Sequence, residues 1–245
     1  MILKDKVVIV TGGTSGIGLA IAKLFIEEGA KVVIGALDEE KGNKIASEIG
    51  ARFVRADVSK EEECKNLIDE TARGFGKLDV LVNNAGISLI NNDKFDITNE
   101  SYERLTSTNL KSVVMMTKYA IPHLLTTKGN VVNISSRAGI QPDPDVPLYS
   151  ATKGAIIIYT RALARQFAKQ GVRLNCVCPG PTDTPLMRSY FDGNVEEMHE
   201  WYRERTPVGR VGEPIDVARV ALFLADERNS FVTGASYVVD GGTLA

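Results

Sequence analysis

The regular alternation of short apolar runs with longer amphipathic stretches constrains the fold more than any other feature of this sequence. Apolar runs rich in β-branched residues occur at 7–10, 31–34, 52–54, 80–82, 130–134, 172–177 and 237–239. Stretches with helical periodicity occur at 17–28, 39–49, 60–75, 99–127 and 149–169. Strands that alternate with helices pair in parallel through right-handed crossovers. Nearly continuous apolar strands indicate that both sheet faces are covered. The sequence therefore predicts an α/β fold, a doubly wound parallel β-sheet flanked by helices on both faces.

The domain organisation follows from the absence of any linker, repeat or low-complexity segment in the 245 residues. We expect one domain that covers residues 1–245. The one long irregular stretch, 179–214, carries large apolar side chains such as Leu186, Tyr190 and Trp201. A long loop with this composition is often functional, and we expect a substrate lid at about 180–213. A subunit interface or a satellite core is the alternative.

Charge and composition exclude several classes of function. The formal charge of −2 gives no reason to expect nucleic acid or an anionic membrane as a partner. No apolar run approaches the ~20 residues that span a bilayer. The first residues lack the apolar core of a signal peptide, which predicts a cytoplasmic protein. Three cysteines make no disulfide framework, and the two histidines have no metal-ligand spacing, so we expect no metal site.

A glycine-rich turn lies directly between the first expected strand and the first expected helix. A helix N-terminus presents unpaired N–H groups and the positive end of a dipole, which together bind pyrophosphate. Glycine permits the tight turn and lets the backbone approach the ligand. The turn therefore predicts a dinucleotide site of the Rossmann-like type. Its expected contacts are Gly12, Thr14, Ser15, Gly16, Ile17 and Gly18.

The spacing of these glycines, G-x-x-x-G-x-G, resembles the cofactor loop of the short-chain dehydrogenase/reductase family in its short single-domain branch. Further motifs agree in order, down to the closing Val239-Asp240-Gly241-Gly242. They are Asp57-Val58, Asn83-Asn84-Ala85-Gly86, Ser136 with Tyr149-Ser150-Ala151-Thr152-Lys153, and Pro179-Gly180. The resemblance covers the whole chain and implies an NAD(P)-dependent oxidoreductase that interconverts a secondary alcohol and a ketone.

The expected catalytic group is built around Tyr149 and Lys153, which lie one turn apart on one face of a helix. A free tyrosine has a pKa of ~10, and a neighbouring ammonium lowers that pKa, so Tyr149 can act as an acid/base. Ser136 follows a strand end that faces the crevice and can hold the substrate oxygen. Ser135 is the competing choice, and family spacing favours Ser136. The resemblance makes Asn109 the fourth catalytic residue, which supports a water-linked proton path to Lys153.

The resemblance also implies the remaining cofactor contacts. Asp57 meets the adenine, and the backbone after Pro179 holds the nicotinamide carboxamide together with the Thr184 hydroxyl. Lys153 bonds the ribose hydroxyls, and Asn83 braces the sheet beside the cofactor. The full set of these expected contacts is Asp57, Val58, Asn83, Ala85, Gly86, Tyr149, Lys153, Pro179, Gly180, Thr182 and Thr184.

The choice between NAD and NADP depends on the end of the second strand, where the chain reads Gly35-Ala36-Leu37-Asp38. An acid there bonds the ribose 2′-hydroxyl and repels a 2′-phosphate. Ala36 occupies the position of the NAD-type acid and Leu37 that of an NADP-type arginine, so the chain departs from both patterns. Asp38 is the nearest charge and is negative. We therefore expect NAD, with NADP as the alternative.

The expected substrate is an apolar alcohol or ketone, cyclic or steroid-like, because the 180–213 segment is rich in aromatic and Met residues. Asp143 and Asp145 would discourage an anionic substrate if they point inward. The alternatives are an NADPH-dependent 3-oxoacyl thioester reductase, and a nucleotide-binding regulator that has lost catalysis. The family is commonly tetrameric. Apolar residues around more than one face of the 149–169 helix agree with that expectation, although a thick core would explain them too.

Overall fold

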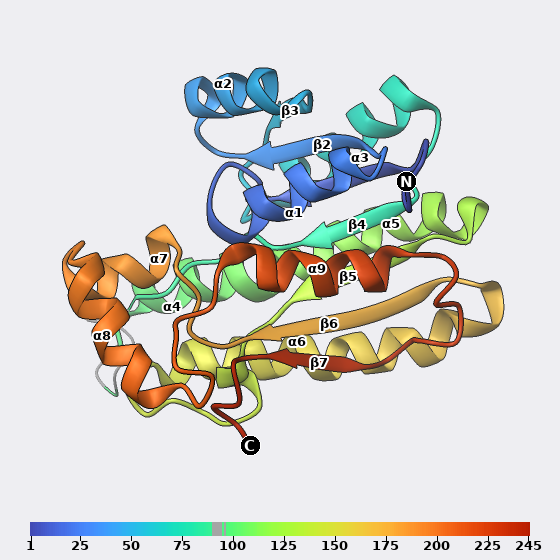
Figure 1. The fold of residues 1–245 in the computed structure, drawn as a ribbon. Coiled ribbons are helices and arrows are strands. Elements are labelled where there is room, and N and C mark those ends of the chain that lie inside the picture. Colours follow the sequence, from blue (N-terminus) through green and yellow to red (C-terminus); the bar gives the residue numbers. More distant parts are fainter. Residues whose placement is uncertain (90–94, 96) are drawn as a thin grey trace.

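The computed structural model describes residues 1–89, 95 and 97–245, and within them a parallel seven-stranded sheet forms the centre of the molecule (Figure 1). Its strand order is β3-β2-β1-β4-β5-β6-β7. The strands are β1 (Val7–Thr11), β2 (Lys31–Ala36), β3 (Arg52–Arg55), β4 (Val80–Asn83), β5 (Asn130–Ile134), β6 (Arg173–Pro179) and β7 (Ser236–Val239). The predicted α/β fold, a doubly wound parallel sheet, is confirmed.

The strand order reverses between β1 and β4, because the chain builds outward from β1 in one direction and then from β4 in the other. The crevice outside the carboxyl ends of the strands at such a switch point is where doubly wound folds bind ligands. In Figure 1 the arrowheads of the strands point towards the side of the molecule that carries α7 (Pro185–Arg188) and α8 (Val195–Arg205). The fold thus places these two short helices over the ligand-binding edge of the sheet.

Helices cover both faces of the sheet, each through its own apolar cluster. On one face lie α1 (Gly16–Glu27), α2 (Glu39–Ile49) and α9 (Pro214–Ala225). The opposite face carries α3 (Glu61–Phe75), α5 (Ser112–Thr127) and α6 (Pro147–Phe167). Phe25 and Leu67 are fully buried representatives of the two layers. Central strands such as β1 and β4 are buried along their whole length because both layers cover them.

The two longest expected helices differ most from the structure, while the others agree to within one residue at each end. The expected helix at 99–127 consists of α4 (Asn99–Thr106), a π-helical turn (Ser107–Lys111) and α5. The helix expected from residue 149 begins two residues earlier, at Pro147, since proline suits the first turn of a helix. It ends at Phe167 and passes into a 3-10 turn (Ala168–Gln170).

The expectation that 179–214 is irregular is wrong. Besides α7 and a 3-10 turn (Ser189–Phe191), the stretch contains the eleven-residue helix α8. Asn194 caps α8 by accepting a hydrogen bond from the backbone N–H of Glu197. Only Met198 is buried among the residues of α8, so its sequence shows little apolar periodicity. The next helix, α9, begins after residues 206–213 and was not expected; Pro214 starts it, and Glu213 and Asp216 form a capping box.

Membrane-spanning helices, metal sites and the cysteines can be examined in the described residues. None of the helices in the described part of the chain is long and apolar enough to cross a membrane. Within residues 1–89, 95 and 97–245, no group of three or more His, Cys, Asp or Glu side chains is arranged to hold a metal ion. Cys176 and Cys178 are free thiols that lie buried in one apolar cluster with residues of α6.

Candidate active site

The glycine-rich turn connects β1 to α1, and its backbone leaves the helix N-terminus available to a ligand. Gly12 and Gly16 adopt positive φ angles of 66° and 51°, a conformation that favours glycine. Ser15 is the N-cap of α1, yet its side chain makes no capping hydrogen bond, and the first turn carries no acid. At α2, by contrast, Asp38 accepts a hydrogen bond from the N–H of Lys41. The first turn of α1 therefore suits a phosphate anion.

Asn84 fixes the shape of this turn from the end of β4. Its side-chain Nδ2 donates to the carbonyl of Thr11 at 2.9 Å, and its backbone N–H donates to Thr11 Oγ1 at 3.0 Å. Gly18 packs so closely below the turn that a Cβ there would lie 2.4 Å from both the Gly12 carbonyl oxygen and Asn84 Nδ2. The turn and the β4 end therefore form one rigid unit. The sequence singled out Asn83 and missed Asn84.

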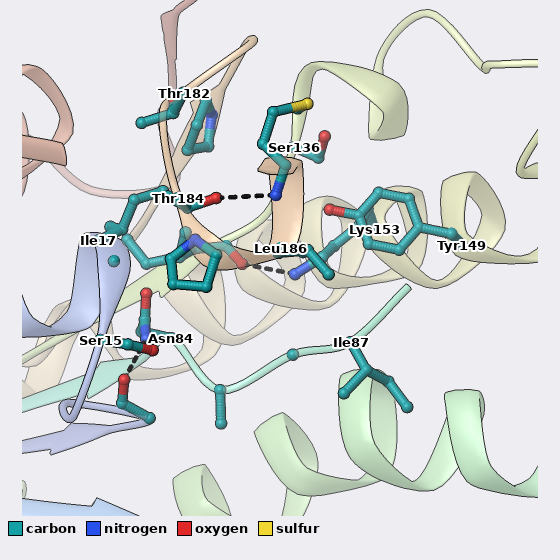
Figure 2. A pocket seen from close by; sticks show the side chains of 18 of the residues that line it. Ser15, Ile17, Asn84, Ile87, Ser136, Tyr149, Lys153, Thr182, Thr184 and Leu186 are labelled. Atoms are coloured by element: carbon teal, nitrogen blue, oxygen red, sulfur yellow. Dashed lines mark hydrogen bonds between the residues drawn. The ribbon is translucent and has the colours of Figure 1, made fainter. Parts of the chain in front are cut away.

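Ser136, Tyr149 and Lys153 meet on one side of the cavity (Figure 2). Ser136 follows β5, and its side chain forms a hydrogen bond with Tyr149. Lys153 lies one turn further along α6, where its Nζ donates to the Ile134 carbonyl at 3.0 Å and lies 5.6 Å from the centre of the Tyr149 ring. Ser135 points elsewhere, since its hydroxyl donates to the Lys153 carbonyl at 2.7 Å. Of the two candidate serines, Ser136 therefore lies beside Tyr149.

Burial dominates the ionisation of the two α6 side chains. It raises the pKa of Tyr149 above its ordinary value, as does Tyr190, while the hydrogen bond with Ser136 lowers it. Burial lowers the pKa of Lys153 from 10.5 to about 8. The expectation that Lys153 lowers the pKa of Tyr149 therefore does not hold for the chain alone. Desolvation of the phenol is the largest influence on that pKa. The Lys153 Nζ donates to the Ile134 carbonyl.

Asn109 lies in the π-helical turn between α4 and α5 and is completely buried. Its Oδ1 accepts from the N–H of Ile87 at 2.8 Å, and its Nδ2 donates to the Ile87 carbonyl at 2.9 Å. A Cβ added at Gly86 would lie 3.3 Å from Lys153 Nζ and 3.4 Å from Asn109 Oδ1. The two polar atoms thus flank one small space. π-helical turns of this kind are frequent at functional sites.

A single cavity of about 710 Å³ brings most of the expected residues together. The expected residues that line it are Gly12, Thr14, Ser15, Gly16, Ile17, Ala36, Leu37, Asp57, Val58, Ala85, Gly86, Ser136, Tyr149, Lys153, Pro179, Gly180, Thr182 and Thr184. Four expected residues do not line it: Gly18, Asp38, Asn83 and Asn109. Two of the four contact residues that do: Gly18 packs against Gly12, and Asn109 binds the backbone of Ile87. Asn83 donates to Asn133 and Thr117 inside the sheet.

The end of the cavity at β2 and β3 is lined by Ala36, Leu37, Asp57 and Val58, the residues expected to meet the nucleoside. Asp57 holds its own loop, accepting hydrogen bonds from the N–H and the hydroxyl of Ser59. Burial raises the pKa of the Asp57 carboxylate, but the Ser59 hydrogen bonds and Lys60 together lower it by more, so the net pKa lies below its ordinary value. Leu37 at the end of β2 is exposed, and no acid side chain lines the cavity at that strand.

The opposite end of the cavity has an aromatic wall from the 180–213 segment. The rings of Phe191, Trp201 and Tyr202 pack edge to face, with centroids 4.6–6.1 Å apart. Several other lining residues were not singled out by the sequence-based search, and apart from Gly35 and Asn84 no motif quoted above contains them. They are Gly35, Ala56, Asn84, Ile87, Arg104, Thr108, Ile134, Arg137, Ala138, Val146, Pro181 and Pro185.

Known proteins resemble this chain over nearly its whole length. A family model described as enoyl-(acyl carrier protein) reductase matches residues 12–243. L-fucose dehydrogenase from Bos taurus is 42% identical over 97% of this chain and 88% of its own length. The NADP-dependent (R)-specific alcohol dehydrogenase of Lentilactobacillus kefiri is also 42% identical, over 99% and 98%. A Caenorhabditis elegans short-chain dehydrogenase/reductase of unknown function, solved with its cofactor, superimposes with a TM-score of 0.94 at 35% identity, covering 100% of this chain and 97% of its own.

Proposed function

The chain belongs to the short-chain dehydrogenase/reductase family, and on that premise we propose that it interconverts a secondary alcohol and a ketone with Tyr149 as the acid/base. Its broader class, an oxidoreductase that acts on CH–OH groups with NAD or NADP, follows from that membership. The observation that carries the finer proposal is the hydrogen-bonded pair of Ser136 and Tyr149, which lines the same cavity as the glycine-rich turn.

We assign the proton transfer to Tyr149 and the orientation of the substrate oxygen to Ser136. The buried phenol keeps its proton at neutral pH, so the chain alone is prepared to donate that proton to a carbonyl oxygen. When bound, the dinucleotide supplies the hydride acceptor or donor, and its oxidised nicotinamide adds a positive charge that favours the phenolate. The protonated Lys153 side chain places its positive charge beside the Tyr149 ring and the Ile134 carbonyl. Asn109 fixes the backbone of Ile87.

The cofactor that we propose is NAD. The first turn of α2 carries Asp38, Glu39 and Glu40, all exposed, directly after the strand end that meets the ribose. Three carboxylates at this position repel a 2′-phosphate. Asp38→Asn tests the idea, because asparagine caps a helix as well as aspartate does but carries no charge. We expect a KM for NADP about threefold lower or better, and little change for NAD. An unchanged KM for NADP would contradict the role of this charge.

The substrate that we propose is cyclic with at least one apolar face. The aromatic wall of Phe191, Trp201 and Tyr202 supports this part of the expectation, since such rings offer a flat apolar surface. Two relatives are named for L-fucose and for (R)-specific alcohols, so a steroid skeleton is not required for a substrate of this site. The 180–213 segment would close over such a ring as a lid.

The two alternative functions have less support. A thioester reductase that docks a carrier protein needs a basic patch, but Arg188 of this segment pairs with Asp183. Glu196, Glu197 and Glu200 add negative charge to the same segment. A regulator without catalysis would not need Ser136, Tyr149, Lys153 and Asn109 together, and the chain keeps all four.

We further propose a homotetramer in the cytoplasm that acts on a small molecule. The exposed Ile158 on α6, with 63% of its surface accessible in the single chain, supports pairing through that helix. The proposed activity is tested by mixing the purified protein with NAD and, separately, NADP and a panel of secondary alcohols and ketones. We expect turnover with NAD and at least one cyclic alcohol. Turnover of none, with a folded protein that binds NAD, would contradict the proposal.

A further inference from the structure

The substrate end of the cavity contains a charged pair that the proposed oxidation does not use. Arg137 follows Ser136 directly, and Asp143 lies on the loop before α6; both line the cavity. Arg137 Nη2 and Asp143 Oδ2 are 3.8 Å apart, and each side chain keeps about a third of its surface exposed, 29% and 33%. A charge-assisted hydrogen bond spans about 2.7–2.9 Å, so the two charges attract each other but form no direct hydrogen bond.

The loop that carries Asp143 is held in place by α6 itself. Ser150 Oγ, one residue after Tyr149, accepts a hydrogen bond from the Asp143 N–H at 3.1 Å. Asp143 Oδ1 in turn accepts from the N–H of Asp145 at 3.0 Å. The other oxygen, Oδ2, is the one turned towards Arg137. The helix that bears the proposed acid/base thus holds the backbone of Asp143, and the Asp145 N–H holds its carboxylate.

Arg137 and Asp143 act across the cavity on the aromatic wall. Burial raises the pKa of Tyr202, Arg137 lowers it, and Tyr190 and Asp143 raise it. The charged pair and the Tyr202 hydroxyl, which donates to Met187 Sδ, therefore share one space. This end of the cavity combines a flat apolar wall with an edge that both donates and accepts hydrogen bonds.

We propose that Arg137 and Asp143 bind a second hydroxyl of the substrate, which makes the substrate an uncharged ring alcohol with adjacent hydroxyl groups. The inference rests on the proposed function and names the substrate class of that site. A hydroxyl is the group that fits, because it can donate to the Asp143 carboxylate while it accepts from the Arg137 guanidinium. Its oxygen can bridge the 3.8 Å gap with an ordinary hydrogen bond to each side.

The charges of the cavity favour an uncharged ligand. Arg104, Arg137, Asp143 and Asp145 all line the cavity, so the formal charges of these four side chains cancel. A carboxylate or ammonium substituent would meet one partner of its own sign whichever way it turned. The apolar face of the ring would lie against Phe191, Trp201 and Tyr202, and its hydroxyl-bearing edge against the charged pair. On this proposal the substrate is amphipathic, whereas the sequence predicts an apolar alcohol or ketone.

The test compares cyclohexanol with the cis vicinal cyclohexanediol, which differs by one hydroxyl, with NAD as the cofactor. For the wild-type protein we expect kcat/KM to be about tenfold or more higher for the diol, the advantage of one charge-assisted hydrogen bond. Asp143→Asn keeps the side-chain volume and an acceptor for the Asp145 N–H, and should reduce the ratio of the two values to about threefold or less. Arg137→Met should reduce the same ratio. Glu196→Gln, an exposed site outside the cavity, should leave it unchanged.

Three results separate the possible failures. A wild-type preference for cyclohexanol overturns the inference and leaves the proposed function intact. An equal loss for both alcohols in Asp143→Asn and Arg137→Met, with NAD binding retained, shows a structural role for the pair and also overturns it. If neither these alcohols nor any other secondary alcohol reduces NAD, the proposed function itself fails. NAD affinity, measured by tryptophan fluorescence, identifies any variant that has not folded.

Discussion

The cofactor end and the substrate end of the cavity are built in different ways. At the cofactor end, polar groups are partly or fully buried and bound to backbone atoms, as the half-buried Asn84 is to Thr11 and the buried Lys153 to Ile134. In the 180–213 segment, which supplies the wall of the substrate end, charged side chains bind one another: Asp183 of the loop after β6 pairs with Arg188 of α7 and His199 of α8, and these two partners are nearly half exposed. The first arrangement has one geometry, whereas the second can be rearranged at small cost. One end is therefore suited to an invariant cofactor and the other to a substrate that must enter and leave.

A pair of glycine substitutions, one near each end of the cavity, should show this difference most strongly. Gly18→Ala forces a methyl group to within 2.4 Å of the Gly12 carbonyl, so we expect about 1–3 kcal/mol of lost stability and NAD binding weaker by about a hundredfold. Gly193→Ala, next to α8, meets no atom within 4 Å and carries only the strain of its φ of 84°, about 1 kcal/mol. Urea unfolding and NAD titration measure both. Equal effects on NAD binding would contradict the distinction between the two ends.

The charge on Lys153 should have the next largest effect, on stability. Its pKa in the folded chain, about 8, is lower than its ordinary 10.5, so the folded state holds fewer protons than the unfolded state between these values. Stability therefore rises with pH across that window, and the full penalty is present below it. Lys153→Met removes the titrating group. The free energy of unfolding of the variant minus that of the wild type should fall by about 2–3 kcal/mol between about pH 7 and about pH 10. A stability difference that does not change with pH would show that the ammonium is not desolvated.

The smallest effect should come from the ion pairs of the substrate end. Asp183→Asn removes the charge that holds Arg188 at 2.6 Å and His199 at 3.1 Å, groups that are nearly half exposed. Exposed pairs contribute about 1 kcal/mol or less. We expect a KM for the alcohol about threefold higher and a smaller change in NAD affinity. Glu227→Gln, which breaks the exposed pair with Lys6, is the matched control. A larger change in NAD affinity than in KM would place Asp183 with the cofactor end.

The sequence predicted the cofactor end better than the substrate end, and the same difference explains why. The conformation of a glycine-rich turn at a strand end is determined by residues that are neighbours in the sequence. The turn from Gly12 to Gly18 could therefore be found from the order and spacing of its residues alone. α8 escaped because its cap, Asn194, precedes a helix with only one buried residue, Met198, which leaves little periodicity to detect. The position of Asp143 beside Arg137 depends on a hydrogen bond from its N–H to Ser150, a contact that no short-range pattern encodes.

The ionisation of Tyr149 is the part of the site that the sequence could not predict. The spacing of Tyr149 and Lys153 places them on one face, as expected. Spacing does not reveal that Lys153 Nζ is directed to the Ile134 carbonyl, nor that both side chains are desolvated. The pKa of the phenol rises instead of falling, and the positive charge that favours the phenolate is left to the bound cofactor.

The most direct test of the account follows the hydrogen atoms. A secondary alcohol that carries deuterium on its carbinol carbon is incubated with NAD and either the wild-type protein or Tyr149→Phe, and the reduced dinucleotide is analysed by mass spectrometry. We expect the wild type to transfer the deuterium to the nicotinamide, and the variant to bind NAD but to transfer it about a thousandfold more slowly. Transfer by Tyr149→Phe at close to the wild-type rate, or loss of the label to water, would contradict direct hydride transfer with Tyr149 as the acid/base.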